Sequence, residues 1–474
     1  MSGHRDNAPL WQWSATELAA AYRAGRVTPV EAVRSCLARI EQVNPQINAF
    51  VALRDAVLED AEASTGRFRA GQPLSVLDGV PLSIKDNLCT ADLPTTWGCP
   101  SLVAHPPAAR DELPVARARA AGALIVGKTN VPEFTLEGYT GNPVFGVTRN
   151  PWDLALTPGG SSGGAVASVA AGCTPLALGT DGGGSIRRPA SHCGLVGFKP
   201  SIGAIARGDG LPSLLLDFEV VGPMARSVAD ARLMFEVLRG PHPTDRASLA
   251  CAAAAQSQRP GLARPPRVLY VPTLSQAPVD PTISAACAGA ANRLRELGFE
   301  VETGDLPLSI EALSRQWPQV GQIGLAAMFN AMPAWRELAS PKYRDMAAQG
   351  DALGAAALWQ LLESVEQLRR DCAHLFETVD LIAMPSAAAL PWPAQEAFPP
   401  AIAGQAVGPR GHAVFTGWVN AAGLPAVSVP VAASAAGLPI GLQLIGAYGA
   451  DDAVLEAAAA FERLCPWTHL RPPL

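Results

Sequence analysis

Charged residues are scarce in this sequence, and their balance is slightly acidic. Lysine, arginine, aspartate and glutamate make up 16% of the 474 residues, which is too few for a disordered chain, and the net charge is −6. Because a nucleic-acid-binding surface is normally basic, this balance argues against one. The sequence also lacks the long acidic or basic blocks that are typical of interaction tails.

Paired cysteine motifs are missing as well. The nine cysteines are scattered and odd in number, and none forms a CxxC pair or a CxxC spacing to histidine. The sequence therefore predicts neither a zinc site nor a disulfide framework. We expect no metal, no cofactor and reduced thiols in a cytoplasmic protein.

Long hydrophobic runs are also absent, although 49% of the residues are hydrophobic and can form a large core. The most apolar stretch, residues 421–433, is interrupted by proline and glycine and is too short to span a bilayer. The opening segment MSGHRDNAPLWQW has no apolar region of the kind found in a secretory signal. We therefore expect a globular protein that does not contact a membrane.

Helix-start signals and short apolar segments alternate along the chain. Capping boxes at Ser14 with Glu17 and at Thr28 with Glu31 predict helices to about residues 23 and 43. We expect further helices at residues 56–70, 111–121, 162–171, 227–238, 281–296, 352–376 and 451–464, and strands at 80–84, 123–126, 175–178, 268–271, 382–384, 426–430 and 440–444. This alternation predicts an α/β fold in which a large twisted mixed β-sheet is covered by helices on both faces.

One domain, residues 1–474, is the preferred organisation. The clearest compositional break, residues 241–266, is rich in alanine, proline and polar residues and is expected to be a loop, with strands on both sides. Within the domain we expect N-terminal helices in residues 1–75, a core in 76–240, a variable helical region that sets specificity in 241–380, and a return to the core sheet in 381–474.

Two glycine–serine runs between residues 157 and 200 form the densest signal. In the second run, Gly182, Gly183 and Gly184 precede Ser185. Glycine permits positive φ and close approach to a ligand, so several backbone N–H groups can converge on one anion. The oxyanion of a tetrahedral intermediate is such an anion, and losing one donor costs about 2.7–4 kcal/mol of transition-state stabilisation. We predict an oxyanion hole at the three glycines and Ser185 as the nucleophile.

Ser185 needs a base, and two routes are open. His192 is the only histidine nearby in sequence, but its surroundings resemble no triad motif, and the GxSxG elbow is absent. The other route uses a desolvated, neutral lysine. The candidate lysines are Lys85, Lys128, Lys199 and Lys342. Lys85 ends the apolar segment GVPLSIK, where burial would lower its pKa.

Four runs, in this order, resemble the amidase signature family: GVPLSIKDN, GALIVGKTNVPEF, TRNPWDLALTPGGSSGG and GTDGGGSIRRPASHCGLVGFKPS. The resemblance covers about residues 15–240 and 380–472. It implies the amidase signature fold and a Ser–cis-Ser–Lys triad, with Ser185 as nucleophile, Ser161 as bridging serine after a cis peptide bond, and Lys85 as base. Ser161 precedes Ser185 by 24 residues, which is the family's spacing. The implied reaction proceeds through an acyl-enzyme and a proton relay.

The resemblance also implies supporting and substrate-binding residues. Ser162 is expected to hydrogen-bond near Lys85, and Asp181 and Arg187 are expected to pair and brace the oxyanion loop. Counting back from the bridging serine places residues 134–138 at the acyl pocket.

Thr135 and Leu136 are the residues of this stretch assigned to substrate binding, with Leu136 pointing toward the substrate. Further specificity is expected from residues 306–353 and 412–420. Several large apolar residues in the first range form either an apolar pocket wall or a packed helix face: Trp317, Met328, Phe329, Met332 and Trp335.

Arg188 has two interpretations. In a family branch that hydrolyses malonamate-type substrates, an arginine at this place holds a substrate carboxylate, and we include Arg188 among the substrate-binding residues. The other interpretation is a surface or structural arginine, because similar runs occur in broad-specificity members. The glutaminase subunit of the tRNA-dependent amidotransferase typically has glutamine at this place.

Gly122 to Thr129 matches the Walker A pattern GxxxxGK[ST] letter by letter. Its four middle residues are apolar, which is typical of a buried strand, and Pro132 follows where the helix of a P-loop should run. We therefore expect Lys128 to be structural. Packing roles are also expected for His192 and Cys193.

The family includes hydrolases of fatty-acid amides, aryl acylamides, carbamates and other substrates. The predicted apolar pocket favours a stand-alone, bacterial-type amidase acting on aryl or alkyl amides, with carbamates (urethanes) as further candidates. Such an enzyme binds a small-molecule amide or carbamate as a monomer or homodimer, without nucleic-acid or membrane partners. Two alternatives remain: a glutaminase-type subunit of a tRNA-dependent amidotransferase, and a catalytically silent binding relative.

Overall fold

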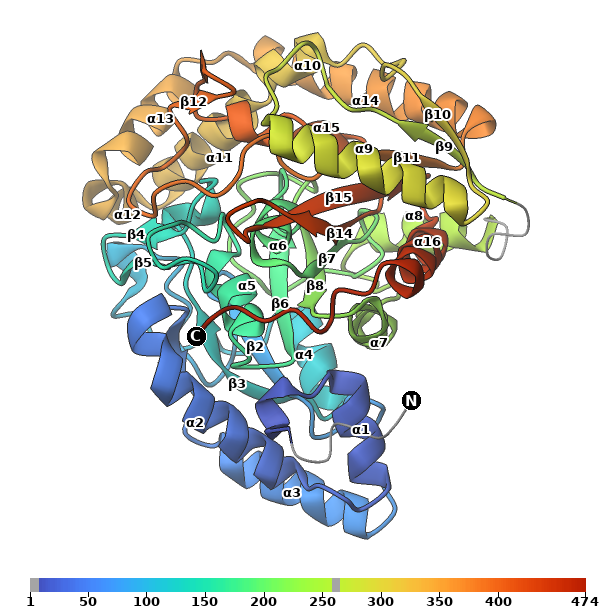
Figure 1. The fold of residues 1–474 in the computed structure, drawn as a ribbon. Coiled ribbons are helices and arrows are strands. Elements are labelled where there is room, and N and C mark those ends of the chain that lie inside the picture. Colours follow the sequence, from blue (N-terminus) through green and yellow to red (C-terminus); the bar gives the residue numbers. More distant parts are fainter. Residues whose placement is uncertain (1–7, 258–264) are drawn as a thin grey trace.

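A large mixed β-sheet runs through the middle of the computed structural model, which describes residues 8–257 and 265–474 (Figure 1). Its eleven strands lie in the order β1-β3-β2-β6-β8-β7-β14-β15-β11-β9-β10. They span Phe50–Leu53 (β1), Pro81–Lys85 (β2), Leu124–Thr129 (β3), Leu176–Asp181 (β6), Val196–Lys199 (β7), Val220–Ala225 (β8), Arg267–Tyr270 (β9), Glu300–Thr303 (β10), Leu381–Pro385 (β11), Ala426–Ala433 (β14) and Pro439–Gly446 (β15). Two short pairs lie outside this sheet: Gly141–Asn142 (β4) with Gly146–Val147 (β5), and Ala401–Ile402 (β12) with Gln405–Ala406 (β13).

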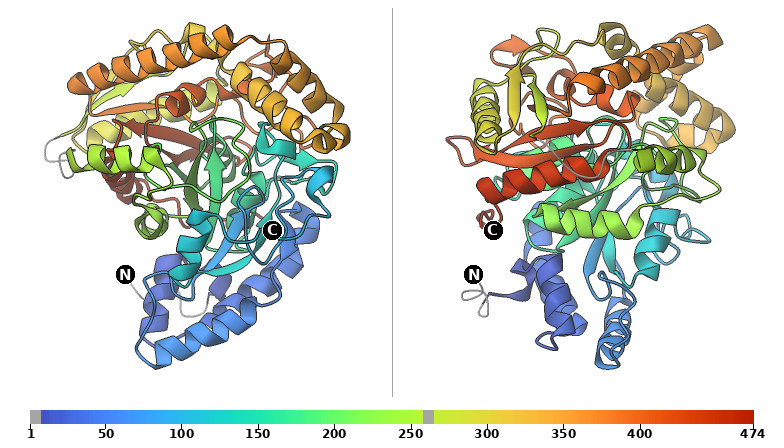
Figure 2. Two further views of the ribbon diagram at one scale, coloured as in Figure 1. Left: turned by 180° about the vertical axis from the view of Figure 1, so that it is seen from behind. Right: turned by 90° about the vertical axis from the view of Figure 1, so that its right-hand side faces the viewer.

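Helices cover the sheet on both faces, which confirms the predicted fold (Figures 1 and 2). They span Ala15–Arg23 (α1), Pro29–Ile47 (α2), Val57–Arg69 (α3), Leu113–Ala120 (α4), Gly163–Ala170 (α5), Arg187–Cys193 (α6), Val228–Leu238 (α7), Arg246–Ser257 (α8), Pro281–Glu296 (α9), Glu311–Gln316 (α10), Pro318–Ala331 (α11), Pro333–Leu338 (α12), Pro341–Asp351 (α13), Ala355–Thr378 (α14), Gly417–Ala421 (α15) and Asp451–Leu464 (α16). Short 3-10 turns occur at Leu10–Gln12, Pro100–Leu102, Glu133–Thr135 and Gly411–Ala413.

The N-terminal helices begin at the predicted capping boxes. Ser14 and Thr28 each accept a hydrogen bond from the backbone of the glutamate three residues later, whose side chain accepts one in return. Helix α1 ends at Arg23 as predicted, but α2 continues past residue 43 and includes Pro45. It ends where Asn48 adopts the left-handed conformation, with φ of 49°.

The predicted loop at residues 241–266 is wrong for its middle part, because Arg246–Ser257 forms helix α8. The segment is rich in alanine, which has the highest helix propensity. Cys251 and Ser248 are buried against the rest of the protein. Residues 258–264 of the predicted loop lie outside the described residues, as do residues 1–7 of the opening segment.

Strands β2, β3, β6 and β8 are buried along their whole length, which is typical of central strands between two helix layers. Strand β2 pairs in parallel with both β3 and β6. The carboxyl ends of β2 and β6 therefore lie side by side, and ligands of open α/β sheets bind beyond such ends. The residues that end β2 and β6 are therefore candidates for the functional site.

None of the described helices is long and apolar enough to cross a membrane. Within residues 8–257 and 265–474, no group of three or more histidine, cysteine, aspartate or glutamate side chains is placed to hold a metal ion. The cysteines, all of which lie in these ranges, are free, and all except Cys465 are buried.

Candidate functional site

Lys85 lies at the carboxyl end of β2, beside the end of β6. Its ammonium nitrogen Nζ donates to Ser161 Oγ at 2.8 Å, to Thr180 Oγ1 at 2.8 Å and to the Thr180 carbonyl at 3.3 Å. The side chain is fully buried. Burial lowers the pKa of Lys85 to about 7, although the charges of Glu219 and Asp181 oppose the shift. A substantial neutral fraction at neutral pH is what a lysine base requires.

Ser161 lies in the first glycine–serine run, just before α5. The peptide bond between Gly160 and Ser161 is cis. Gly160 packs so tightly that a Cβ on it would lie 2.2 Å from the Tyr139 carbonyl oxygen. The neighbouring Ser162 donates its hydroxyl hydrogen to the Thr180 carbonyl at 3.1 Å, the same oxygen that Lys85 contacts. Ser162 therefore lies near Lys85, where the resemblance places it.

Ser185 lies in the loop between β6 and α6. Its carbonyl accepts a hydrogen bond from the Ser162 backbone N–H at 3.2 Å, so the two serine runs are in contact. Ser185 is 8% exposed and lines, together with Ser161, a cavity of about 740 Å³. Within the described residues the Ser185 hydroxyl makes no hydrogen bond to Ser161, so this step of the proton relay stays a prediction.

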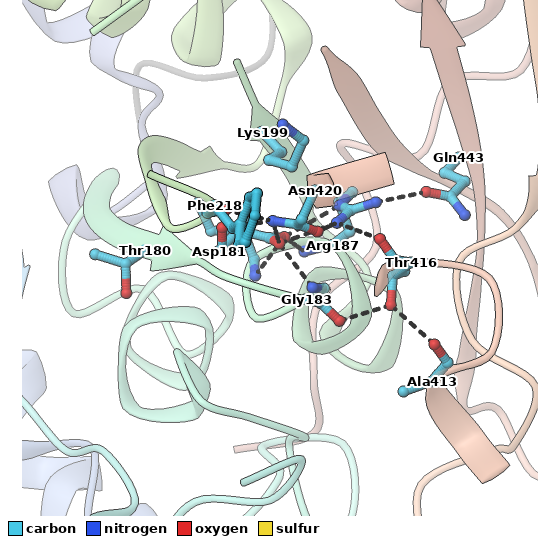
Figure 3. Close-up of polar contacts among 12 residues, drawn as sticks. Thr180, Asp181, Gly183, Arg187, Lys199, Phe218, Ala413, Thr416, Asn420 and Gln443 are labelled. Carbon is cyan, nitrogen blue, oxygen red and sulfur yellow. Dashed lines mark hydrogen bonds and ion pairs between the residues drawn. The ribbon is translucent and has the colours of Figure 1, made fainter. Parts of the chain in front are cut away.

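A buried ion pair braces the loop that precedes Ser185 (Figure 3). Arg187 donates to both carboxylate oxygens of Asp181, from Nη2 at 2.9 Å and from Nε at 3.1 Å. Burial alone would raise the pKa of Asp181, but Arg187 holds it well below the usual value. Asp181 also accepts from the backbone N–H of Gly184 at 2.6 Å and of Ile186 at 3.0 Å.

These bonds correct the predicted oxyanion hole in one position. The N–H of Gly184 is bonded to Asp181 and therefore does not point at an oxyanion. Gly182 and Gly183 line the cavity with Ser185, whereas Gly184 does not. The Gly184 N–H is already bonded to the Asp181 carboxylate. The N–H groups of Gly182, Gly183 and Ser185 therefore remain as candidate donors to the oxyanion.

We expect Asp181→Asn to lower the free energy of unfolding by about 3–5 kcal/mol, because it leaves Arg187 buried beside a neutral partner. Glu236→Gln is the control, since Glu236 pairs with Arg239 at the surface and such pairs contribute about 0–1 kcal/mol. Urea unfolding of both variants measures the difference. A loss below about 1 kcal/mol for Asp181→Asn would show that the pair does not hold the loop.

Side chains from the last quarter of the chain complete this brace, and no sequence pattern predicted these contacts. Asn420 of α15 donates to the Asp181 carbonyl at 2.7 Å, and Arg187 donates to Gln443 of β15 at 3.0 Å. The Thr416 hydroxyl donates to the Gly183 carbonyl at 2.7 Å (Figure 3). Thr416 and Asn420 fall within residues 412–420, which were expected to set specificity, whereas nothing in the sequence indicated Gln443.

Two further residues around Lys85 were also missed, and of these Thr180 contacts Lys85 directly. Thr180 accepts from Lys85 and from the side-chain amide of Asn87 at 3.0 Å, and Asn87 also donates to Glu219 at 3.0 Å. Thr180 stands directly before Asp181 in the run that carries the nucleophile. Its position at the end of β6 was the available signal.

The cavity is bounded by segments that the sequence assigned to specificity. Thr135 and Leu136 line it, whereas Phe134 is fully buried. Phe134 and Thr135 adopt positive φ, of 55° and 58°, which L residues rarely adopt. Residues from the two other predicted ranges also line the cavity: Ser314, Arg315, Trp317, Pro318, Gly321, Lys342, Met346, His412 and Ala413.

The predicted apolar pocket wall is wrong for most of its members. Met328 and Phe329 are buried in a separate hydrophobic cluster with Phe134 and Tyr343, and Met332 and Trp335 pack against it. They form the packed helix face that was the other interpretation, and Trp317 alone of the five lines the cavity.

Arg188 lies in the wall of the cavity and is 5% exposed. Its Nη1 donates to Nε2 of His412 at 2.5 Å, whereas Nε is buried without a partner and Nη2 makes no hydrogen bond within the described ranges. Burial, and next the charge of Arg410, lower the pKa of Arg188 to about 9. Burial holds the pKa of His412 well below its usual value, so a neutral ring accepts from a largely charged arginine.

The cavity carries an excess of positive charge. Lys342 pairs with Glu137 at 3.0 Å, and Glu219 pairs with Arg207 at 3.5 Å. The arginines in the wall, Arg188, Arg315 and Arg410, form no ion pair with any residue in the described ranges. The cavity therefore favours a ligand that brings a carboxylate or other acceptor groups.

Three other residues singled out in the sequence, Lys128, His192 and Cys193, do not belong to the catalytic site. Lys128 lies on the buried strand β3, 3.2 Å from an Asp86 carboxylate oxygen, so the match to Walker A is structural. His192 is buried and contacts the Ala389 carbonyl at 3.1 Å, and Cys193 is packed in a hydrophobic cluster. Neither His192 nor Cys193 lines the cavity.

Comparison with known proteins connects this geometry to a family. The amidase family model matches residues 31–455. The chain is 34% identical to the glutamyl-tRNA(Gln) amidotransferase A-subunit of Picosynechococcus sp., covering 94% of this chain and 96% of the relative, and 36% identical to its counterpart in Symbiobacterium thermophilum, covering 97% and 98%. A crystal structure of a bacterial aryl acylamidase superposes with a TM-score of 0.87 at 30% identity and covers 98% of both chains.

These relatives contradict two predictions. The prediction of a stand-alone hydrolase of aryl or alkyl amides and carbamates is wrong, because the relatives at 34–36% identity along nearly the full chain are amidotransferase subunits. The prediction of a monomer or homodimer whose only partner is a small-molecule amide or carbamate is wrong for the same reason. The predicted apolar wall was a poor guide to the substrate, because four of its five side chains pack elsewhere, whereas three arginines stand among the residues that line the cavity.

Proposed function

The chain belongs to the amidase signature family, and from this premise we propose that it is the glutamine-hydrolysing subunit of a tRNA-dependent amidotransferase. The observation that carries the proposal is the identity of 34–36% to such subunits over nearly the whole chain. The three arginines in the wall of the cavity that Ser185 lines support it, because glutamine carries a carboxylate as well as its side-chain amide. Such a protein acts with partner chains.

In the proposed reaction neutral Lys85 takes a proton from Ser161, and Ser161 takes one from Ser185. Ser185 Oγ attacks the side-chain carbonyl carbon of glutamine, and the N–H groups of Gly182, Gly183 and Ser185 bind the oxyanion. The proton returns through Ser161 to the leaving nitrogen, the C–N bond breaks, and ammonia departs. Water then hydrolyses the acyl-enzyme by the reverse relay and releases glutamate.

The supporting and substrate-binding residues receive roles by the same reasoning. Asp181 and Arg187 fix the loop that carries the donors, and Ser162 fixes the carbonyl beside Lys85. Thr135 and Leu136 bound the acyl side of the cavity. Arg188 replaces the glutamine that is typical of this subunit, and its Nη2 is proposed to bind the substrate carboxylate.

We expect the full chain to release glutamate from L-glutamine much faster than it releases p-nitroaniline from acyl anilides. Arg188→Met should raise KM for glutamine at least about tenfold, because a charged hydrogen bond contributes about 1.5–3 kcal/mol. Arg370→Met, an exposed arginine of α14 that does not line the cavity, is the control. Coupled detection of glutamate measures both. Rapid anilide hydrolysis with no glutamate release would contradict the proposal.

A further inference from the structure

A second cavity lies beside the catalytic cavity and shares a wall with it. Its volume is about 370 Å³, and its lining is largely apolar, with Leu274, Ile310, Leu313, Val414 and Trp418. The residues common to both cavities are Ser314, Arg315, Trp317, Arg410, Gly411 and Ala413. The two cavities therefore share one wall.

Two hydrogen-bond donors, on Arg410 and Trp317, lie in the shared wall. A glycine that lines the catalytic cavity and another that lines the second cavity both lie close to them. Gly183 lines the catalytic cavity, and a Cβ on it would lie 3.6 Å from both Arg410 Nη2 and Trp317 Nε1. Gly417 lines the second cavity, and a Cβ there would lie 3.3 Å and 3.4 Å from the same two atoms. A guanidinium N–H and an indole nitrogen thus lie next to the proposed oxyanion loop.

Neither donor meets an acceptor in the part of the chain that the structure describes, since the guanidinium of Arg410 and the indole of Trp317 make no hydrogen bond or ion pair there. A third donor, the buried indole N–H of Trp418, also has no partner within the described ranges. Glu311 lines the second cavity, but its carboxylate accepts from the Ser275 hydroxyl at 3.1 Å. Only the Trp418 donor is buried, and because buried donors are normally satisfied, its missing partner is an acceptor on a ligand. Arg410 is exposed at the junction, so its guanidinium and the Trp317 indole N–H can bind the same ligand.

We propose that this junction is a carboxylate-binding subsite. Arg410 and Trp317 bind the carboxylate, and the second cavity holds the apolar body of the same ligand, with Trp418 as a further donor. A guanidinium and an indole N–H match the acceptor oxygens of a carboxylate, whereas the apolar lining suits a short aryl or alkyl chain. The carboxylate belongs either to the amide substrate or to a separate small acid, and the same donors bind it in both cases.

Isothermal titration of the full chain with 3-phenylpropionate, and with the neutral 3-phenylpropanol as matched probe, tests the subsite without any catalytic readout. The acid should bind at least about tenfold more tightly than the alcohol. Arg410→Gln should weaken acid binding about tenfold or more and leave the alcohol unchanged, whereas Arg370→Gln, which lines neither cavity, should change neither. Equal affinity for acid and alcohol, or wild-type acid affinity in Arg410→Gln, overturns the proposal.

A second variant locates the ligand and identifies its source. Val414 lines the second cavity and not the catalytic one, so Val414→Trp should fill the second cavity and abolish acid binding. If the same variant raises KM for glutamine, the substrate carboxylate occupies the junction; if KM is unchanged, the subsite serves a separate acid. Undiminished acid binding by Val414→Trp overturns the proposal, and it does so whether or not glutamine is hydrolysed.

Discussion

Replacing Ser185 with alanine is expected to reduce glutamine hydrolysis by about four to six orders of magnitude, the range seen when the nucleophile of a serine hydrolase is removed. The substitution deletes the attacking oxygen and leaves the loop held by Asp181 and Arg187. Since the cavity is otherwise unchanged, the loss should fall on kcat rather than on substrate binding. Glutamate release measures kcat, and titration with glutamine measures binding.

Ser191→Ala is the matched control for this experiment. Ser191 is a buried serine of α6, six residues beyond Ser185, and it does not line the cavity. We expect its rate to stay within a few-fold of the wild type. If Ser185→Ala keeps more than about a hundredth of the rate while remaining folded, another group performs the attack.

The sequence predicted the parts of the site that lie in local motifs, whereas the parallel pairing that brings these motifs together was not predicted. Lys85 ends an apolar segment that forms β2, and Thr180 and Asp181 end β6, which pairs in parallel with β2. The first serine run precedes β6 in the chain and leads directly into α5. The structure accordingly brings Lys85 to 2.8 Å from Ser161, although their catalytic roles stay predictions.

The parts that were missed depend on contacts across long sequence separations. Asn420, Thr416 and Gln443 contact the nucleophile loop from more than 200 residues away. No local pattern predicts such contacts, because they follow from the order of strands in the sheet. The use of the Gly184 N–H by Asp181 likewise depends on the conformation of one turn, which a run of glycines leaves open.

Strands β7 and β8 were not predicted from the sequence, for a different reason. Strand β8 contains Gly222 and Pro223, residues that ordinarily mark turns, and β7 contains Gly197. In the structure β8 lies between β6 and β7, and a Cβ on Gly222 would lie 2.1 Å from the Phe198 carbonyl. Only glycine fits here because the two backbones approach closely. Gly222 therefore hid the strand in the sequence but is needed for the packing of β8.

The error about substrate arose because the catalytic motifs are shared by every branch of the family. Those motifs predict the reaction at Ser185, whereas the cavity wall is built from segments without a motif. Periodicity alone does not distinguish a packed helix face from a pocket wall, and Met328 and Phe329 proved to be buried. The three arginines that do line the cavity come from separate segments, so their convergence follows only from the fold.

Replacing Lys85 with methionine is expected to reduce kcat by about three to six orders of magnitude, because the relay loses the group that accepts the first proton. In the wild type the active form is neutral Lys85, with a pKa of about 7. The value of kcat/KM should therefore rise tenfold per pH unit below about pH 6 and level off above about pH 8. Lys85→Arg should not restore activity, since a guanidinium stays protonated.

Lys199→Met is the matched control, because Lys199 is equally buried and burial likewise lowers its pKa to about 7, but it does not line the cavity. Both substitutions remove a base whose folded-state pKa is lowered. The cost of burying its charge is present below about pH 7 and vanishes as the pH rises toward the unfolded value of 10.5. Neither variant should therefore be less stable than the wild type at about pH 6, as urea unfolding can measure. A large loss of activity in Lys85→Met alone, with stability kept, assigns the base to Lys85; an equal loss in both variants would contradict that assignment.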